Sequence, residues 1–206
     1  SNPYPSAVNF ASLTRSNVAN VFYVWDPKLA GVYGLGAYVA VSYNSSTGNY
    51  DQTASTSPIS KYIQSGEAFF VKATDTTQTG TLTFKETDKT ASGSDLVFRV
   101  QGIEQSVRVN MFQSSVADSL SLLDGVLATF DEDNNNSVDD YDAPKLLGSN
   151  ESLSLKRAGR LISIERRKPT VVTDTLYLNI SQMRIGSYHF EIDMKNMNLN
   201  ASAAFL

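Results

Sequence analysis

One short stretch of the chain, residues 131–142, concentrates oxygen-bearing side chains in the sequence DEDNNNSVDDYD. Six of these residues are carboxylates, which repel one another unless a cation lies among them. Ca²⁺ is held by loops of this length that direct about six or seven oxygens at one ion. The candidate ligands stand at the first, third, fifth, seventh, ninth and twelfth positions of the loop, and they are Asp131, Asp133, Asn135, Ser137 through its carbonyl, Asp139 and Asp142. The spacing therefore predicts a structural calcium site.

Two residues depart from the usual pattern of calcium loops. Asn136 takes the sixth place, where Gly is usual, although Asn adopts the left-handed conformation more readily than most residues. Asp142 closes the loop with a side chain one methylene shorter than the usual Glu. Val138, at the eighth position, is expected to turn into the core. The alternative is a solvated acidic turn, and mutual repulsion of the carboxylates favours calcium over it.

Catalytic chemistry has little support in the sequence. His189 is the only histidine, there is no cysteine, and no serine stands in a Gly-x-Ser-x-Gly turn. Alternation in the segment 188–194 places His189 on the polar face of a strand together with Glu191 and Asp193. We therefore expect no enzyme. A pair of carboxylates that meets only in the folded protein, as in glycoside hydrolases, is the weakest of the alternatives.

Aromatic residues offer a second kind of site. Trp25 and Tyr23, with Tyr33, Tyr38 and Tyr43 near them in the sequence, could stack on sugar rings. The alternative is core packing, which is the commoner role of aromatic residues on strands. The basic run 166–168 is expected to be solvated at the end of a hairpin and is too small to bind nucleic acid.

Composition excludes several classes of protein. The 206 residues carry 17 basic and 21 acidic groups, and the net charge of −4 arises after residue 92, because the first part has six groups of each sign. Hydrophobic residues make up 41% and charged residues 18%, which argues against a disordered chain. No run of 18 apolar residues exists, so we expect no membrane insertion, and no basic excess indicates a nucleic-acid partner.

The elements that would position these residues are strands. Segments with an apolar residue at every second position predict strands at 18–25, 36–43, 67–73, 80–86, 97–100, 107–112, 125–130, 153–157, 160–166, 175–180 and 187–194. Ala158 and Gly159 are expected to form the tight turn of a hairpin. The segment 6–13 is the one predicted helix, with Ser6 as its cap.

Short strands joined by polar turns predict an all-β protein with two antiparallel β-sandwich domains in tandem, of jelly-roll or immunoglobulin-like type. The small polar segment 88–95 is the expected seam. The first domain then covers residues 1–92, and the second covers residues 93–206 and contains the acidic loop. The segment 44–58 is expected to be a loop.

Three motifs, NPYPSA at 2–7, FYVWDP at 22–27 and YIQSGEAFFV at 62–71, resemble a recurring β module of large exported surface proteins of the Bacteroidetes. Four segments of the second half are similar to the region that lies directly after this module in many such proteins, and they are RVN at 108–110, DGVL at 124–127, DDYDAPKL at 139–146 and IERR at 164–167. The resemblance covers nearly the whole chain.

This resemblance implies export by type IX secretion and display at the cell surface. It also implies that the first domain lacks an upstream strand and that the chain is a segment of a longer protein. We therefore expect a non-catalytic structural or adhesive module (an adhesin-like part), with neighbouring domains of the longer chain, surface glycans or other surface proteins as its partners. The alternative is a carbohydrate-binding module attached to a surface enzyme.

Overall fold

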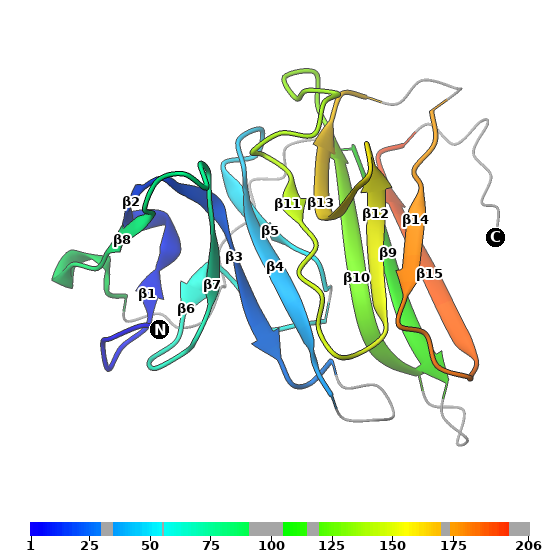
Figure 1. Ribbon diagram of the computed structural model, residues 1–206, viewed down its shortest axis with the longest axis horizontal. Coiled ribbons are helices and arrows are strands. Elements are labelled where there is room, and N and C mark those ends of the chain that lie inside the picture. Colours follow the sequence, from blue (N-terminus) through cyan, green and yellow to red (C-terminus); the bar gives the residue numbers. More distant parts are fainter. Residues whose placement is uncertain (30–34, 55, 91–104, 115–119, 170–173, 198–206) are drawn as a thin grey trace.

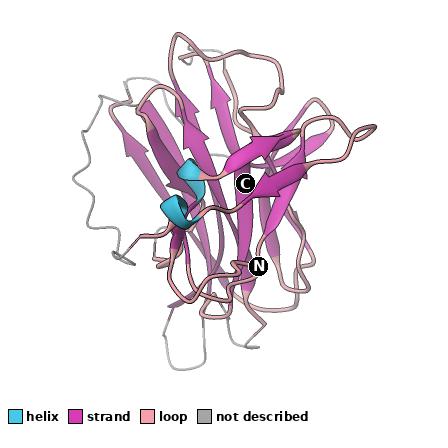
Figure 2. Cartoon of the chain, turned by 90° about the vertical axis from the view of Figure 1, so that its left-hand side faces the viewer, coloured by secondary structure: helices cyan, strands magenta, loops and turns pink. Residues whose placement is uncertain are grey.

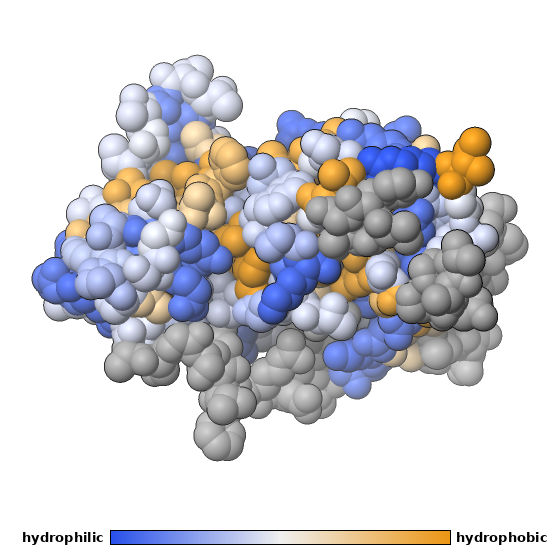
Figure 3. All heavy atoms as spheres, turned by 90° about the horizontal axis from the view of Figure 1, so that it is seen from below, coloured by the Kyte–Doolittle hydropathy of each residue, from blue (hydrophilic) through white to orange (hydrophobic). Residues whose placement is uncertain are grey.

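The computed structural model describes residues 1–29, 35–54, 56–90, 105–114, 120–169 and 174–197. Within these ranges the protein is all-β, as predicted, with two single-turn helices (Figures 1 and 2). No helix in this part of the chain is long and apolar enough to cross a membrane. Polar and apolar residues are interspersed over the face seen in Figure 3.

A four-stranded antiparallel sheet forms the middle of the first half. Its order is β5-β4-β3-β7, and its strands are β3 (Val18–Asp26), β4 (Ala37–Asn44), β5 (Asn49–Gln52) and β7 (Phe70–Ala73). β3 and β4 alternate apolar residues and lie where they were predicted. β5 falls in the segment that was expected to be a loop, so that expectation was wrong. Tyr50 explains this strand, because its ring packs at the edge of the core against Phe10.

The N-terminal residues form short strands instead of the predicted helix 6–13. Two small pairs cap the four-stranded sheet, β1 (Val8–Asn9) with β6 (Tyr62–Ile63) and β2 (Thr14–Ser16) with β8 (Thr81–Thr83). Only η1 (Phe10–Ser12) is helical there, and η2 (Glu86–Asp88) is the other short turn. Val8 lies opposite Ile63, and both are fully buried. This long-range pairing outweighs the local capping signal of Ser6.

The second half forms a larger sheet in the order β14-β12-β13-β10-β9-β15, with β11 added on β13. Its strands are β9 (Gln105–Ser114), β10 (Leu120–Phe130), β11 (Ala143–Pro144), β12 (Ser152–Arg157), β13 (Arg160–Arg167), β14 (Leu178–Ser181) and β15 (Tyr188–Lys195). The β12–β13 hairpin turns at Ala158 and Gly159, both with positive φ, as predicted. One pair departs from the expected antiparallel pattern, because β10 and β13 are parallel.

This larger sheet curls. β14 and β15 lie at opposite ends of the strand order, yet they are consecutive in the chain and are joined by residues 182–187 only. Figure 1 shows β13, β12 and β14 running in front of β10, β9 and β15. Apolar side chains fill the inside of the curl, and they include Met111, Leu123, Phe130, Leu153 and Ile162.

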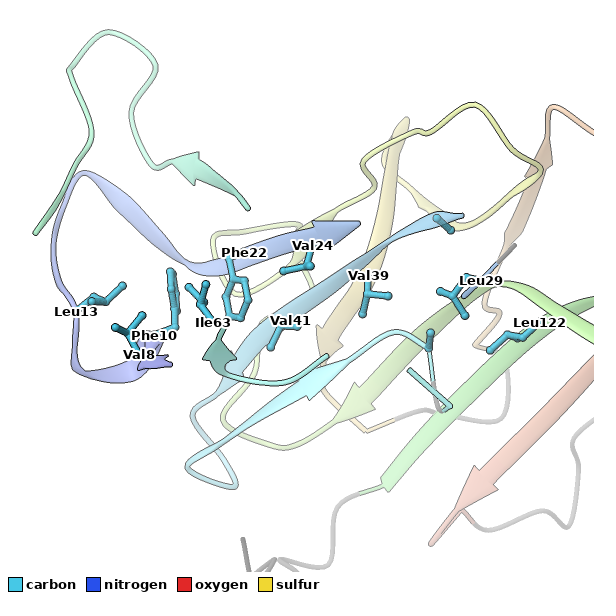
Figure 4. Packing of buried hydrophobic residues seen from close by; sticks show 12 residues of the cluster. Val8, Phe10, Leu13, Phe22, Val24, Leu29, Val39, Val41, Ile63 and Leu122 are labelled. Atoms are coloured by element: carbon cyan, nitrogen blue, oxygen red, sulfur yellow. The ribbon is translucent and has the colours of Figure 1, made fainter. Parts of the chain in front are cut away.

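Buried side chains also connect the two halves of the chain. One cluster gathers around Phe10, Phe22 and Ile63 in the first half and reaches Leu122 on β10 (Figure 4). A second cluster joins Ala19, Val21, Tyr23 and Ala40 to Leu127, Ala143 and Ile164. Gly125 lets the backbones approach, because a Cβ atom there would lie 2.5 Å from the carbonyl oxygen of Thr53. The two sheets therefore share part of their core.

Tandem sandwich domains are not confirmed by this arrangement. Most of the predicted seam, together with the predicted strand 97–100, lies outside the described residues. The division at residues 92 and 93 stays a prediction. The remaining predicted strands all overlap observed ones, although β7, β8 and β14 are shorter than expected.

Candidate functional site

The acidic loop 131–142 connects β10 to β11 and lies beside the end of β13. Its backbone is fixed at both ends. Asp131 donates its N–H to the carbonyl of Arg167 at 3.0 Å, and Arg166 donates its N–H to the Asp142 carboxylate at 2.8 Å. Val138 is partly buried against the core inside the curl, as predicted for the apolar position of the loop. The end of β13 therefore holds both ends of the loop.

Three of the predicted ligands accept hydrogen bonds from the backbone two residues further on. Asp131 accepts from Asp133 at 3.0 Å and Asn135 accepts from Ser137 at 3.0 Å. Asp139 accepts from Tyr141 at 2.9 Å. Such turns shape a loop without an ion. Asp133, Asn135 and Ser137 are exposed to solvent.

Asp142 differs from the other acids because it is only 2% exposed. Its two oxygens accept from the backbone N–H groups of Arg166 and Asp139, at 2.8 and 2.9 Å. Burial raises the pKa of Asp142, and the charges of Asp139 and Glu165 add to this, while the two hydrogen bonds oppose it. Asp142 and Asp139 are thus two predicted ligands that lie in contact, and one of them is buried.

The remaining ligands do not join them in one group. Among the residues that the structure describes, no set of three or more acidic, histidine or cysteine side chains is placed to hold a metal ion. Asp131 and Asp133 lie at the start of the loop and interact with each other through the backbone. The calcium site therefore stays a prediction.

The aromatic residues near Trp25 divide into buried and accessible rings. Tyr23 is 5% exposed and donates its hydroxyl to the carbonyl of Pro144 at 2.8 Å, and burial raises its pKa. Trp25 is half-buried, and its ring centroid lies 4.8 Å from that of Tyr38. Tyr38 in turn contacts Phe70, which is 57% exposed. A row of rings thus ends at the surface on β7.

Two other aromatic candidates are not part of this row. Tyr43 packs instead on Tyr50, with a centroid distance of 5.5 Å. Tyr33 lies outside the described residues.

His189 lies on β15 and is exposed, as predicted for the polar face of that strand. Its ring contacts Phe112 on the neighbouring strand at a centroid distance of 6.2 Å. Glu191 and Asp193 are exposed on the same face. The three residues form a solvated strand surface.

The basic run 166–168 was expected to be solvated, and this was wrong for its first two residues. Arg166 is 1% exposed and Arg167 is 6% exposed. Arg166 donates to Asp51 at 2.9 Å, and Arg167 pairs with Asp174 at 2.5 Å. Fixed carboxylate partners supply the reason, since a guanidinium that finds fixed acceptors can leave water.

Two further ion pairs, each with a buried carboxylate, were not predicted from the sequence. Lys145 pairs with Asp124, and both side chains are 4% exposed. Glu151, with a fully buried side chain, accepts from Arg184 at 2.8 Å and from the hydroxyl of Tyr188 at 3.0 Å. Glu151 follows the polar turn 148–150, and nothing in its spacing signals burial. Asp124 stands within an apolar strand, and this was the one local sign available.

A small pocket lies next to these pairs. Its lining includes Tyr38, Asp124, Lys145, Glu151 and Ser152. A second pocket, beside the acidic loop, is lined by Lys72, Asp139, Asp142 and Arg160 among others. Both are far smaller than the cavities that bind drug-sized ligands.

Comparison with known proteins gives one match. Residues 1–204 match a protein family described as a domain of unknown function, DUF8693. No curated protein and no solved structure matches the chain.

Proposed function

The chain belongs to the DUF8693 family, and we propose that it is a non-catalytic structural or adhesive β module of a secreted or cell-surface bacterial protein. One observation carries the proposal: buried charged side chains join strands that are distant in the sequence. Arg166 joins β13 to β5, and Lys145 fixes the chain after β11 to β10. These ionisable groups hold strands together, as expected of a scaffold.

The exported location rests on the resemblance to surface modules of the Bacteroidetes, including the type IX route. Its test is labelling of intact cells, of the bacterium that encodes the chain, with an amine reagent that does not cross membranes. Exposed lysines such as Lys156 and Lys168 are expected to react before lysis. A cytoplasmic protein of the same cells serves as the control. Labelling that requires lysis contradicts the proposal.

We further propose that residues 1–92 and 93–206 are two sandwich-like units packed against each other. The cluster inside the curl draws only on the second range, and the cluster around Phe10 draws mainly on the first. The neighbouring domains of a longer chain would attach to these units.

The proposed cofactor is one structural calcium ion in the acidic loop. Its support is the spacing of the ligands and the closeness of Asp139 and Asp142. Titration calorimetry with CaCl₂, and thermal melting with calcium or chelator, provide the test. We expect heat of binding and a higher melting temperature with calcium, and both are expected to vanish in Asp133→Ala. Equal melting and no heat contradict the site.

Sugar binding is the second candidate, and the surface end of the aromatic row favours it. Flat rings at the surface can stack on sugars, and Phe70 presents one. A glycan array compares the wild type with Trp25→Ala and Phe70→Ala. Tyr141 is 56% exposed on the acidic loop, so Tyr141→Ala is a matched control. Binding that only the first two substitutions remove supports this function, and no binding contradicts it.

A further inference from the structure

Lys145 and Asp124 are a close, buried pair of groups with complementary reactivity. Asp124 lies in the middle of β10, and Lys145 follows β11. The amine nitrogen lies 2.7 and 2.5 Å from the two carboxylate oxygens. Both side chains are 4% exposed, so little water surrounds the pair.

The backbone holds both partners in place. The N–H of Gly125 donates to one Asp124 oxygen and the N–H of Leu153 donates to the other, each at 2.8 Å. The N–H of Lys145 donates to the carbonyl of Leu161 at 2.8 Å, which ties the lysine backbone to β13. In the protonated carboxyl group, a donor on the carbonyl oxygen polarises the C=O bond and stabilises the negative charge that develops on that oxygen during attack. The carboxyl carbon is therefore set up as an electrophile.

We propose that the side chains of Lys145 and Asp124 condense to an intramolecular amide, an isopeptide cross-link between β10 and the segment after β11. A proton first passes from the ammonium to the carboxylate, which leaves a neutral amine and a carboxylic acid. Nζ then attacks Cγ, and the N–C bond forms. The C–O bond of the protonated oxygen breaks, and the hydroxyl leaves with a second proton from the nitrogen as water.

The reaction is balanced without any other reagent. An ammonium and a carboxylate become one amide and one water molecule, and the net charge does not change. Fixed geometry replaces a bimolecular encounter by an effectively unimolecular step. The adjoining pocket offers the product water a place beside the pair, and Glu151 is the other carboxylate that lines it.

The intact mass of the purified, folded chain tests the proposal directly. We expect a mass lower than the sequence mass by one water molecule. After proteolysis, tandem mass spectrometry should find a branched peptide that joins residues 124 and 145. The full sequence mass, in protein kept folded for several days, overturns the proposal.

A matched variant separates this cross-link from another dehydration. Asp124 precedes Gly125, and the glycine nitrogen could itself attack the carboxyl carbon to give a cyclic imide with the same loss of water. Lys145→Arg keeps a positive charge near Asp124 but cannot form the amide. The variant is expected to show the full sequence mass. Loss of water that persists in Lys145→Arg overturns the proposal, and because the wild-type mass is measured independently, the test survives a variant that folds poorly.

Discussion

Arg166 donates from its guanidinium to the carboxylate of Asp51 at 2.9 Å, across 115 positions of the chain. The guanidinium side chain is fully buried, and that of Asp51 is 13% exposed. The same guanidinium also donates to the Ser42 carbonyl at 3.1 Å and to the Thr129 hydroxyl at 3.2 Å. One side chain of the larger sheet thus holds two strands of the smaller one.

Replacement of Arg166 by Ala is expected to lower the free energy of unfolding by about 3–5 kcal/mol, because Asp51 would be left without its buried partner. Urea unfolding of the wild type and the variant measures this difference. Arg160 lies on the same strand and is exposed, so Arg160→Ala is the control, expected within about 0.5 kcal/mol of the wild type. If Arg166→Ala lowered the free energy of unfolding no more than Arg160→Ala does, the ion pair of Arg166 with Asp51 would contribute nothing to stability.

Gly125→Ala is expected to destabilise the protein by about 1–3 kcal/mol through overpacking. The new methyl group would meet the Thr53 carbonyl oxygen at 2.5 Å and Asn110 Oδ1 at 3.0 Å. Gly186→Ala is the matched control, because its nearest neighbour there is the end of the flexible Gln113 side chain at 3.4 Å. Urea midpoints compare the two variants. Equal urea midpoints for Gly125→Ala and Gly186→Ala would contradict the prediction, because the backbone at Thr53 would then move aside at no cost in stability.

Residues 93–206 produced alone are expected to lack a cooperative thermal transition. The separation would expose Leu127, Ala143 and Ile164, which now pack on β3 and β4, and would deprive Arg166 of Asp51. Circular dichroism during heating measures the transition. Addition of residues 1–92 should restore it. A transition of the isolated fragment equal to that of the whole chain would show two independent domains.

The contribution of Asp142 to the free energy of unfolding is expected to fall as the pH rises. Its pKa in the folded protein is raised by burial, so the folded state binds a proton more tightly than the unfolded state does. The stability that this proton contributes is complete below the ordinary pKa of Asp, about 3.9. It is lost as the pH rises through the folded-state value.

The test compares the wild type with Asp142→Asn in urea, in the presence of chelator, from about pH 4 upward. The neutral amide cannot ionise, so the variant should gain stability relative to the wild type as the pH rises. A difference that stays constant with pH contradicts the raised pKa.

The sequence predicted the strands well wherever apolar residues alternate without interruption. β3, β4, β12 and β13 match their predicted bounds within one residue. Errors arose where a distant partner decides the structure. Val8 pairs with Ile63 instead of starting a helix, and Tyr50 draws a polar segment into the sheet by packing on Phe10.

The candidate site could be predicted only in part, for a related reason. The sequence located the acidic loop and the apolar position of Val138, because both depend on near neighbours. The burial of Asp142 and Arg166 depends on a parallel pairing of β10 with β13 that no local pattern encodes. Similarly, Lys145 and Asp124 are separated by 21 positions, and their contact follows from the path of β11 along β13.

The ion pair between Asp51 and Arg166 also has a consequence for the lifetime of the folded state. Hairpins such as β12–β13 close short loops, whereas this pair closes a loop of more than a hundred residues and carries a larger entropic cost. We therefore expect the pair to form after the rate-limiting step of folding. A contact formed that late slows unfolding without speeding folding. Arg166→Ala should accordingly unfold faster while refolding at nearly the wild-type rate, so that this one contact sets how long the two sheets stay together.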